Sequence, residues 1–232
     1  MAKSAQLRLT RSGTVINATS KGQEKEVISA LRLIEPMLKD EFGVRLAFIS
    51  DWYLKDIVAS LKESFPDVDF YHHFEKSSIR PDGGVLFIVD NDQKKYPILI
   101  GEVKNQGTND KRAEEGLAKQ AKGNAIERLG KNVIGLRTAL LRETIFPFVC
   151  FGYGCDFADN SSILDRVVTI AMFGRLNITH LHQQGPSGEF RRGSFYFREA
   201  KWSVSEMQEI LYDVARRSIQ YYFSKYGEGL FR

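Results

Sequence analysis

Three residues in the middle of the chain have the types and spacing of a metal-dependent hydrolytic site. Asp82 is followed, after nineteen residues, by Glu102, with Lys104 two positions later. Two apolar runs, at residues 83–90 and 97–104, flank a polar turn, so we expect an antiparallel hairpin. In such a hairpin Asp82 lies beside the end of the second strand, where Glu102 and Lys104 point to the same face. The spacing therefore predicts two carboxylates and a lysine at one strand end.

The chemistry of this trio is that of Mg²⁺-assisted hydrolysis. Mg²⁺ favours oxygen ligands and keeps several waters, so Asp82, Glu102 and the backbone carbonyl of Val103 are candidate ligands. A bound Mg²⁺ stabilises charge on a phosphodiester oxygen and lowers the pKa of a bound water. Lys104 would position the attacking water or steady the charge around phosphorus. An ordinary surface pair at the end of a hairpin would have the same sequence, so the pattern alone leaves both interpretations open.

The strand that carries Glu102 has the composition of a core strand. Residues 98–100 of this strand are all apolar. The charged side chain of Glu102 is therefore expected to lie next to a buried sheet. Gly101 has no β-carbon and permits close approach of another segment. Val103 alternates with the two charged residues and is expected to face the core.

The remaining elements follow from apolar periodicity. Helices are expected at residues 22–41, 51–64, 110–142 with a break near Gly123, 161–173 and 203–223. Asp51 is a candidate N-cap, and Ser203 with Glu206 predicts a capping box. Further strands are expected at residues 146–153, 177–182 and 194–197. The chain is therefore predicted to have a mixed α/β fold, with helices on both faces of a central sheet that contains the hairpin.

Bulk properties restrict the class of protein. The 232 residues fit one domain, and no apolar run approaches the roughly 20 residues that span a bilayer. The N-terminus lacks the apolar core of a signal peptide, so we expect a soluble, cytoplasmic protein with no membrane partner. Residues 104–142 carry nine Lys/Arg against four Asp/Glu. That excess suits a phosphate-rich partner, although a solvated helix surface can have the same composition.

Neither the cysteines nor the histidine pairs indicate a metal centre. Cys150 and Cys155 lack the spacing of a zinc site and are expected to be reduced. The pairs His72-His73 and His180-x-His182 have no Cys or His partners at zinc spacing, so structural or surface roles are expected.

Several segments resemble a known group of nucleases. The pattern Pro81-Asp82, then Glu102-x-Lys104, resembles the PD-(D/E)xK nuclease superfamily. Three segments resemble its EcoRI-type restriction endonucleases, namely SIRPDGG at residues 78–84, the ExKxQG pattern at 102–107 and GNAIER at 123–128. The likeness covers residues 75–180 well and the two ends poorly.

The resemblance implies both a fold and an activity. The fold is a restriction-endonuclease-like central mixed β-sheet flanked by α-helices, in a single nuclease domain over residues 1–232 with DNA-recognition elements inserted at about 105–130. The activity is Mg²⁺-dependent hydrolysis of double-stranded DNA by a homodimer at a short palindrome, giving 5′-phosphates. A cognate DNA methyltransferase is the implied genetic partner. By resemblance, Asp82 and Glu102 are catalytic metal ligands and Lys104 is the catalytic lysine.

The GNAIER segment carries the expected base recognition. By resemblance, Asn124, Ala125 and Arg128 read an inner AATT, and Glu127 orients arginine side chains. The chemistry suits these roles, because Asn pairs with the N6 and N7 positions of adenine and Arg donates to purine N7. Taken alone, the hexamer would also fit an ordinary N-capped helix start. Further candidate DNA contacts are Gln106, Lys122, Gly123 and Arg166.

The sequence leaves other questions open. Residues 117–122 and Ile163 differ from the family where the outer base pair is read, so only the AATT core is predicted. A repair or recombination nuclease of the same fold and a catalytically silent DNA-binding protein are the alternatives. The intact trio argues against the silent protein, and GNAIER argues against a structure-specific nuclease. Whether Glu24 or Glu26 of the first helix joins the site is undetermined, as is the dimer interface.

Overall fold

The computed structural model describes residues 15–105, 107–118 and 124–232. Short 3₁₀ turns lie at Cys155–Phe157 and Glu228–Leu230. The helices and strands of the described residues are α2 (Val15–Phe42), β1 (Arg45–Ile49), β2 (Trp52–Tyr53), α3 (Leu54–Ser64), β3 (Ser78–Ile79), β4 (Gly84–Val89), β5 (Lys95–Asn105), α4 (Gly107–Glu114), α5 (Asn124–Thr138), β6 (Phe148–Tyr153), α6 (Ile163–Ile170), β7 (Ser194–Arg198) and α7 (Val204–Tyr226).

A five-stranded mixed sheet forms the centre of the fold, in the order β1-β4-β5-β6-β7. Strands β1, β4 and β5 pair antiparallel, and β5, β6 and β7 pair parallel. The predicted hairpin is β4–β5, with Gly84 opposite Gly101. A separate two-stranded ribbon joins β2 to β3. β5 is the middle strand: its residues 95–101 pair with β4, and its carboxyl end, residues 100–105, pairs with β6.

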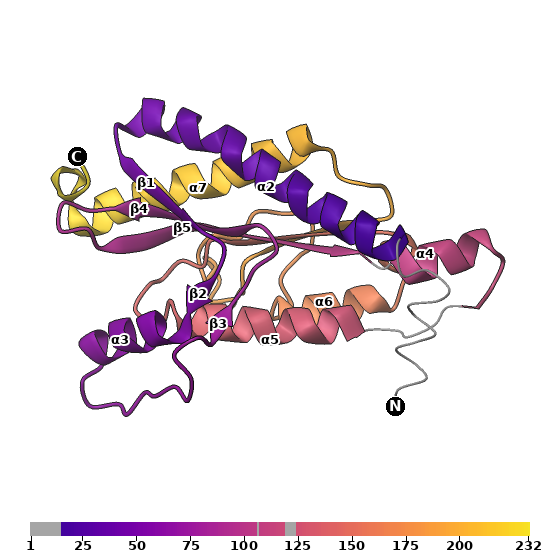
Figure 1. Cartoon of the computed structure of the whole chain (residues 1–232), viewed down its shortest axis with the longest axis horizontal. Helices are drawn as coiled ribbons and strands as arrows, with labels where there is room; N and C mark the ends of the chain where they lie inside the picture. Colours follow the sequence, from indigo (N-terminus) through magenta and orange to yellow (C-terminus); the bar gives the residue numbers. More distant parts are fainter. Residues whose placement is uncertain (1–14, 106, 119–123) are drawn as a thin grey trace.

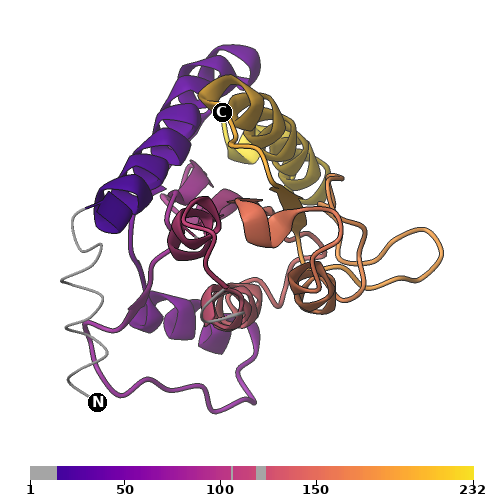
Figure 2. The same ribbon diagram turned by 90° about the vertical axis from the view of Figure 1, so that its right-hand side faces the viewer.

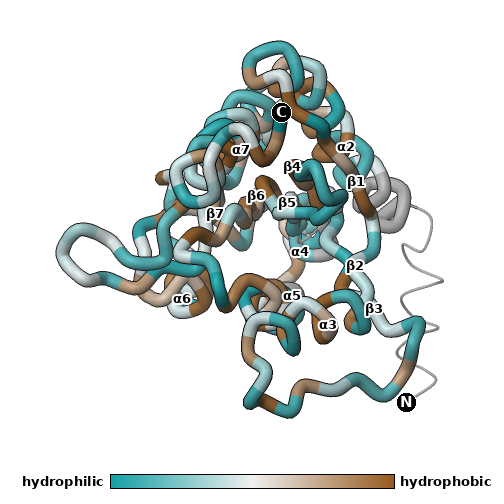
Figure 3. Tube along the Cα trace, turned by 90° about the vertical axis from the view of Figure 1, so that its left-hand side faces the viewer, coloured by the Kyte–Doolittle hydropathy of each residue, from teal (hydrophilic) through white to brown (hydrophobic). Residues whose placement is uncertain are grey.

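Helices cover both faces of this sheet, as predicted (Figure 1). Seen end-on, the central strands lie between α2 and α7 on one side and α5 and α6 on the other (Figure 3). On the first side, Leu31 and Leu211 pack with Leu99 in one buried cluster. On the other side, Leu129 of α5 packs with Phe148 in a second cluster. The sheet is thus buried on both faces, which explains the near-continuous apolar runs of its strands.

The end of the sheet where β5 runs into α4 faces the viewer in Figure 2. Helix α2 passes above this end and α5 below it. Segments from three distant parts of the sequence therefore meet around the carboxyl end of β5.

The helix predicted at residues 51–64 begins later than expected, and Asp51 is not its N-cap. Helix α3 starts at Leu54, and its N-cap position is occupied by Tyr53, without a side-chain hydrogen bond. Trp52 and Tyr53 instead pair with β3. The Asp51 carboxylate accepts a hydrogen bond from the Ser50 hydroxyl at 2.9 Å and lies 3.8 Å from the Arg80 guanidinium. These partners compete with the helix N–H groups for the carboxylate.

The strand predicted at residues 177–182 is wrong. Asn177 has a left-handed φ of 60°, which interrupts an extended backbone. Its side-chain Oδ1 accepts from the Phe197 N–H at 2.8 Å, and its own N–H donates to the Phe195 carbonyl at 2.8 Å. Asn177 alone therefore bonds these two backbone groups at the edge of β7, and residues 177–182 do not pair with β7 as a strand.

Most other predicted elements are confirmed with shifted ends. The capping box of α7 is present, since Ser203 Oγ accepts from the Glu206 N–H at 3.2 Å and Glu206 Oε2 from the Ser203 N–H at 2.9 Å. Helix α6 is shorter than expected because Met172 and Phe173 have left-handed φ values of 57° and 62°. Strand β1 was not predicted. No helix among the described residues has both the length and the apolarity needed to span a membrane.

Candidate active site

A tight turn places Asp82 over the end of β5. The Gly84 N–H donates to the Pro81 carbonyl at 3.0 Å, and the Gly83 N–H donates to the Gly101 carbonyl at 2.9 Å. Gly84 has a φ of 75°, which favours glycine, and a β-carbon there would lie 2.6 Å from the Phe48 ring. The Gly83 backbone is the segment that comes close to Gly101, and a β-carbon on Gly83 would lie 3.0 Å from the Gly101 carbonyl oxygen. The two glycines therefore hold Asp82 close to β5.

The Asp82 and Glu102 carboxylates of the predicted trio both contact the Nζ atom of Lys104. The Lys104 ammonium donates to Asp82 Oδ2 at 2.8 Å and to the Val103 carbonyl at 3.2 Å, and it contacts Glu102 Oε1 as well. Glu102 Oε2 also accepts from the backbone N–H of Asp82 at 3.0 Å. Strand alternation places Glu102 and Lys104 on one side, while the Val103 side chain packs into the core beside α2 and α7. The structure thus brings together all four residues predicted for catalysis and metal binding.

Burial sets the electrostatics of this cluster. Glu102 is 0% exposed, and this burial raises the pKa of its carboxyl above the ordinary value, only partly opposed by Lys104. Burial alone would lower the pKa of Lys104, but the Glu102 and Asp82 carboxylates outweigh it and raise that pKa. Lys104 therefore stays an ammonium ion. With both carboxylates charged, the trio has a net charge of −1, which favours uptake of a further cation.

Cys150 lies beside Glu102 on the neighbouring strand, but its thiol is not a candidate nucleophile. It pairs in register with Glu102 on the neighbouring strand β6 and is fully buried. Burial raises the pKa of its thiol well above the ordinary value, so the thiolate that a nucleophile needs is suppressed. Cys150 and Cys155 form no disulfide, as predicted, and Cys155 is only partly buried.

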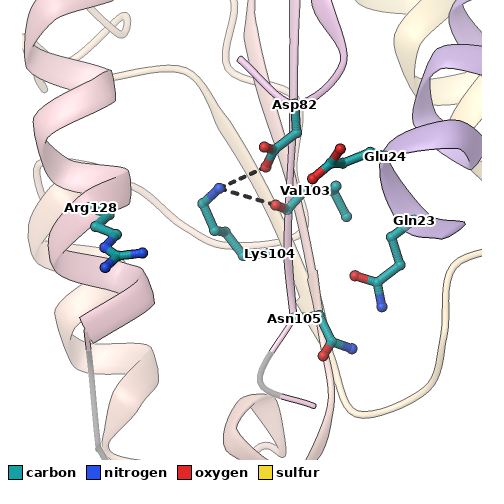
Figure 4. Close-up of a pocket in the computed structure, with 7 residues that line it drawn as sticks. All are labelled: Gln23, Glu24, Asp82, Val103, Lys104, Asn105 and Arg128. Carbon is teal, nitrogen blue, oxygen red and sulfur yellow. Dashed lines mark hydrogen bonds and ion pairs between the residues drawn. The ribbon is translucent and has the colours of Figure 1, made fainter. Parts of the chain in front are cut away.

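A cavity of about 290 Å³ opens beside the trio. It has room for a cation with several waters, since each water occupies about 30 Å³ of liquid. Figure 4 shows Arg128 reaching in from α5 on one wall and Gln23 from α2 on the other, with Lys104 between them. The seven lining residues are Gln23, Glu24, Asp82, Val103, Lys104, Asn105 and Arg128.

The structure separates Glu24 and Glu26, the two candidate carboxylates of α2. Glu24 lines the cavity together with Asp82. Glu26 instead forms an ion pair with Lys201, at 2.7 Å between Nζ and Oε1. If a carboxylate of the first helix joins the site, the geometry therefore favours Glu24.

The predicted recognition residues differ in how close they lie to the cavity. Asn124 and Ala125 form the first two positions of α5, which begins where the break near Gly123 was expected. Glu127 is exposed on the same helix, and Arg128 lines the cavity beside Lys104. Arg166 is exposed on α6 and does not line this cavity. Three of the candidate DNA contacts lie outside the described residues, namely Gln106, Lys122 and Gly123.

Sequence reasoning missed three polar residues at the site. Asn132 of α5 donates from Nδ2 to Glu102 Oε1 at 3.3 Å, and Gln23 and Asn105 line the cavity. A signal for two of them exists in the sequence. Gln23 lies one helical turn before Val27 in the buried stripe of α2, and Asn132 lies three residues after Leu129 in that of α5. A polar side chain in an apolar stripe requires a polar partner on the sheet.

Comparisons with known proteins identify relatives of this chain. The sequence profile of a family described as "Restriction endonuclease EcoRI" matches residues 10–229. The type II restriction enzyme RsrI of Cereibacter sphaeroides is 31% identical, over 82% of this chain and 79% of that protein. The type II restriction enzyme EcoRI of Escherichia coli is 27% identical, over 87% of this chain and 86% of that protein.

The chain belongs to the EcoRI family of restriction endonucleases. As a member it is a type II restriction enzyme, a site-specific deoxyribonuclease that acts on double-stranded DNA. The predicted resemblance and enzyme class are confirmed, and the repair nuclease and the silent DNA-binding protein are set aside. The α/β fold predicted from the resemblance is also confirmed.

The oxygen atoms gathered at the trio fit a hard divalent cation such as Mg²⁺. Asp82, Glu102 and the Val103 carbonyl offer only oxygen atoms, and all three contact one cationic nitrogen. Mg²⁺ is commonly held by one or two carboxylates and keeps water for its other positions. The buried, partly compensated charge of Glu102 also favours a divalent cation at this place.

Proposed function

We propose that this chain hydrolyses phosphodiester bonds of duplex DNA with Mg²⁺ at the trio formed by Asp82, Glu102 and Lys104. The observation that carries the proposal is the convergence of two carboxylates and one carbonyl on the Lys104 ammonium. A site of this kind can hold a cation and still present a positive group to a phosphate. The products would carry 5′-phosphates.

The residues of the trio have distinct proposed roles. Asp82, Glu102 and the Val103 carbonyl would hold the ion, and Asp82 is kept in reach by its backbone N–H bond to Glu102. When bound, Mg²⁺ supplies a Lewis acid for the phosphate oxygen and a water of lowered pKa. Lys104, which remains charged next to two carboxylates, would donate hydrogen bonds to the phosphate or orient the attacking water.

We propose that the beginning of α5 reads the DNA sequence. Asn124, Ala125 and Arg128, oriented by Glu127, would read an AATT core, and Asn suits adenine for the reason given above. Gln106, Lys122, Gly123 and Arg166 are further candidate contacts. The position of α5 beside the cavity supports the proposal, because Arg128 lines the same cavity as Lys104.

The proposed architecture and partners follow from the same activity. Residues 1–232 would form one nuclease domain, with recognition elements inserted at about 105–130, between β5 and β6. A palindromic site calls for a homodimer with one trio for each DNA strand. A DNA methyltransferase would protect host DNA, and the protein would act in the cytoplasm, where it meets its substrate.

The deciding experiment is digestion of a sequenced plasmid in Mg²⁺, followed by sequencing of the fragment ends. Discrete fragments with 5′-phosphates and a shared AATT-centred palindrome are the expected result, with no cleavage in EDTA. The common ends would also identify the outer base pair and the cleavage position. Cleavage without a shared sequence, or equal cleavage in EDTA, would contradict the proposal.

A further inference from the structure

Gln23 of α2 has a buried hydrogen-bond donor without a partner among the described residues. The residue is only 4% exposed. Its side-chain Nε2 is buried and has no hydrogen-bond partner in the described part of the chain. Buried polar side-chain atoms nearly always have a partner, so an unused amide donor requires an explanation. A glutamine with a purely structural role would be expected to donate within the protein.

The side chain lines the proposed active site. Gln23 shares the cavity with Asp82 and Lys104, which the trio brings together, and with Asn105 at the end of β5. In Figure 4 the Gln23 amide extends from α2 on the wall opposite Arg128, with Lys104 between the two. A group that enters the cavity beside Lys104 therefore passes between Arg128 and Gln23.

The charges of the cavity explain why a neutral donor would be useful at this place. The α2 wall also carries Glu24, and Asp82 lies next to it, so this side is negative. A phosphodiester oxygen only accepts hydrogen bonds, and it would be repelled by both carboxylates. An amide N–H binds such an oxygen without adding charge that competes with the metal site. Gln and Asn side chains are common donors to DNA phosphates.

We propose that Gln23 binds DNA by donating a hydrogen bond from Nε2 to a phosphodiester oxygen of the strand that is cut. Rotation about the soft terminal torsion of the side chain brings Nε2 toward the cavity without moving the backbone. Helix α2 would thus hold the cut strand from the side opposite Arg128. The inference rests on the proposed active site and adds a substrate contact from a helix outside the catalytic hairpin.

The test is a cycle that combines a protein variant with a DNA modification. Gln23→Met keeps the length of the side chain and removes the donor. The DNA is a short duplex that contains the site found by plasmid digestion. Each modified duplex carries one methylphosphonate, at the cleaved phosphate or at one of its neighbours. Binding in Ca²⁺ is measured for each protein and duplex pair. Glu26→Gln is the matched control, because Glu26 lies on the same helix but faces Lys201.

Gln23→Met is expected to weaken binding of the unmodified duplex by about tenfold, as for loss of one hydrogen bond to a charged acceptor. One methylphosphonate position should weaken the wild type by a similar factor and cause no further loss in the variant. Glu26→Gln should match the wild type on every duplex. Additive losses at every phosphate would overturn the proposal, because a structural role of Gln23 does not couple to one phosphate.

A second measurement needs no variant and covers a failure of Gln23→Met to fold. A crystal structure of the wild type with the same duplex in Ca²⁺ should show Gln23 Nε2 within about 3.2 Å of a phosphate oxygen. A donor that bonds only protein or water atoms would overturn the inference. If the wild type cuts no DNA at all, the proposed function fails and this inference with it. If the wild type cuts but the cycle is additive, only the role of Gln23 fails.

Discussion

At the residue scale, Glu102 is unusual because it is an acidic side chain that is fully buried. It is fully buried, and its neighbours are Lys104, the Asp82 N–H and Asn132. Burying a carboxylate is costly unless it is paired, so each partner stabilises the carboxylate in its buried position next to Asp82 and Lys104. Removing this one side chain should therefore separate DNA binding from cleavage.

We expect Glu102→Ala to reduce Mg²⁺-dependent cleavage by at least about 10³-fold, the scale for loss of a group that stabilises transition-state charge. Specific binding in Ca²⁺ should remain measurable, because α5 is unchanged. Gel-shift titration and single-turnover cleavage would measure both, with Glu26→Gln as the surface control. Retained cleavage would remove Glu102 from the site.

His180 gives the fold a dependence on pH. The side chain is buried, and its Nε2 lies 3.0 Å from the Arg175 carbonyl. Burial lowers the pKa of His180 below its ordinary value of 6.5, and this hydrogen bond opposes the effect only in part. As the pH falls below about 6.5, the unfolded chain binds a proton that the folded chain does not bind. The free energy of unfolding must therefore fall with decreasing pH, down to the lowered pKa of the folded state.

We expect this loss to reach about 1.4 kcal/mol for each unit by which the pKa of His180 is lowered. His180→Gln keeps a donor for the Arg175 carbonyl but cannot titrate. Urea unfolding at pH 8 and pH 5 should show a smaller difference between the two pH values for the variant than for the wild type. Equal differences would show that His180 does not control the acid sensitivity.

At the element scale, α5 connects the proposed recognition and catalytic groups. Asn124 is its first residue, Arg128 lines the cavity one turn later, and Asn132 reaches Glu102 after another turn. Positions four apart in a helix lie on nearly the same face. A helix that shifts when it meets the wrong bases would therefore shift Asn132 relative to Glu102.

The first prediction for α5 concerns its N-terminus. Asn124→Ala should lose roughly 1–3 kcal/mol of discrimination for each affected base contact. Cleavage rates on duplexes that differ at one A·T pair would measure this discrimination. If the variant prefers the same sequence by the same factor, Asn124 does not read a base.

The second prediction concerns the link to the trio. Asn132→Ala should lower the single-turnover cleavage rate by roughly 10–100-fold, as seen when a partner of a metal ligand is removed. Affinity for the duplex in Ca²⁺ should stay within about twofold, because the contact to Glu102 lies inside the protein. Lys131→Ala, at an exposed neighbour on the same helix, is the control. A parallel loss of affinity would instead indicate a DNA contact.

At the scale of the whole molecule, the fold provides one trio per chain at one end of the sheet. Strands β5, β6 and β7 run parallel toward this end, and α2 and α5 close over it from opposite faces (Figures 1 and 2). On the proposed mechanism, a single trio cuts one strand at a time. Cutting both strands of a palindrome in one binding event therefore needs two chains related by the symmetry of the DNA.

We expect sedimentation velocity to show a dimer bound to the cognate duplex, with two chains for each DNA molecule. A mixed dimer of wild-type and Glu102→Ala chains should nick one strand and leave the other intact. A monomer bound to the cognate duplex would contradict the symmetric mechanism, whereas the trio itself would be unaffected.

The hairpin and the composition of its proposed catalytic end follow from local sequence patterns. Turn residues, strand alternation and the spacing of Asp82, Glu102 and Lys104 are local properties, and the register of β4 and β5 follows from the short connection between them. That is why the trio and the inward direction of Val103 could be predicted. The capping box of α7 is local in the same sense, since both partners lie within one turn.

The residues that surround the trio could be identified only from the tertiary structure. Gln23, Glu24 and Asn132 lie far from Glu102 in the sequence, and their approach depends on how α2 and α5 are rotated against the sheet. The choice of Glu24 over Glu26 likewise depends on which side of α2 faces the cavity. Residues 177–182 were misassigned because the side chain and the backbone N–H of one asparagine, Asn177, bond the backbone of the edge strand β7 without a second strand. Helix docking and edge capping are set by the sum of many distant contacts, which local sequence patterns do not specify.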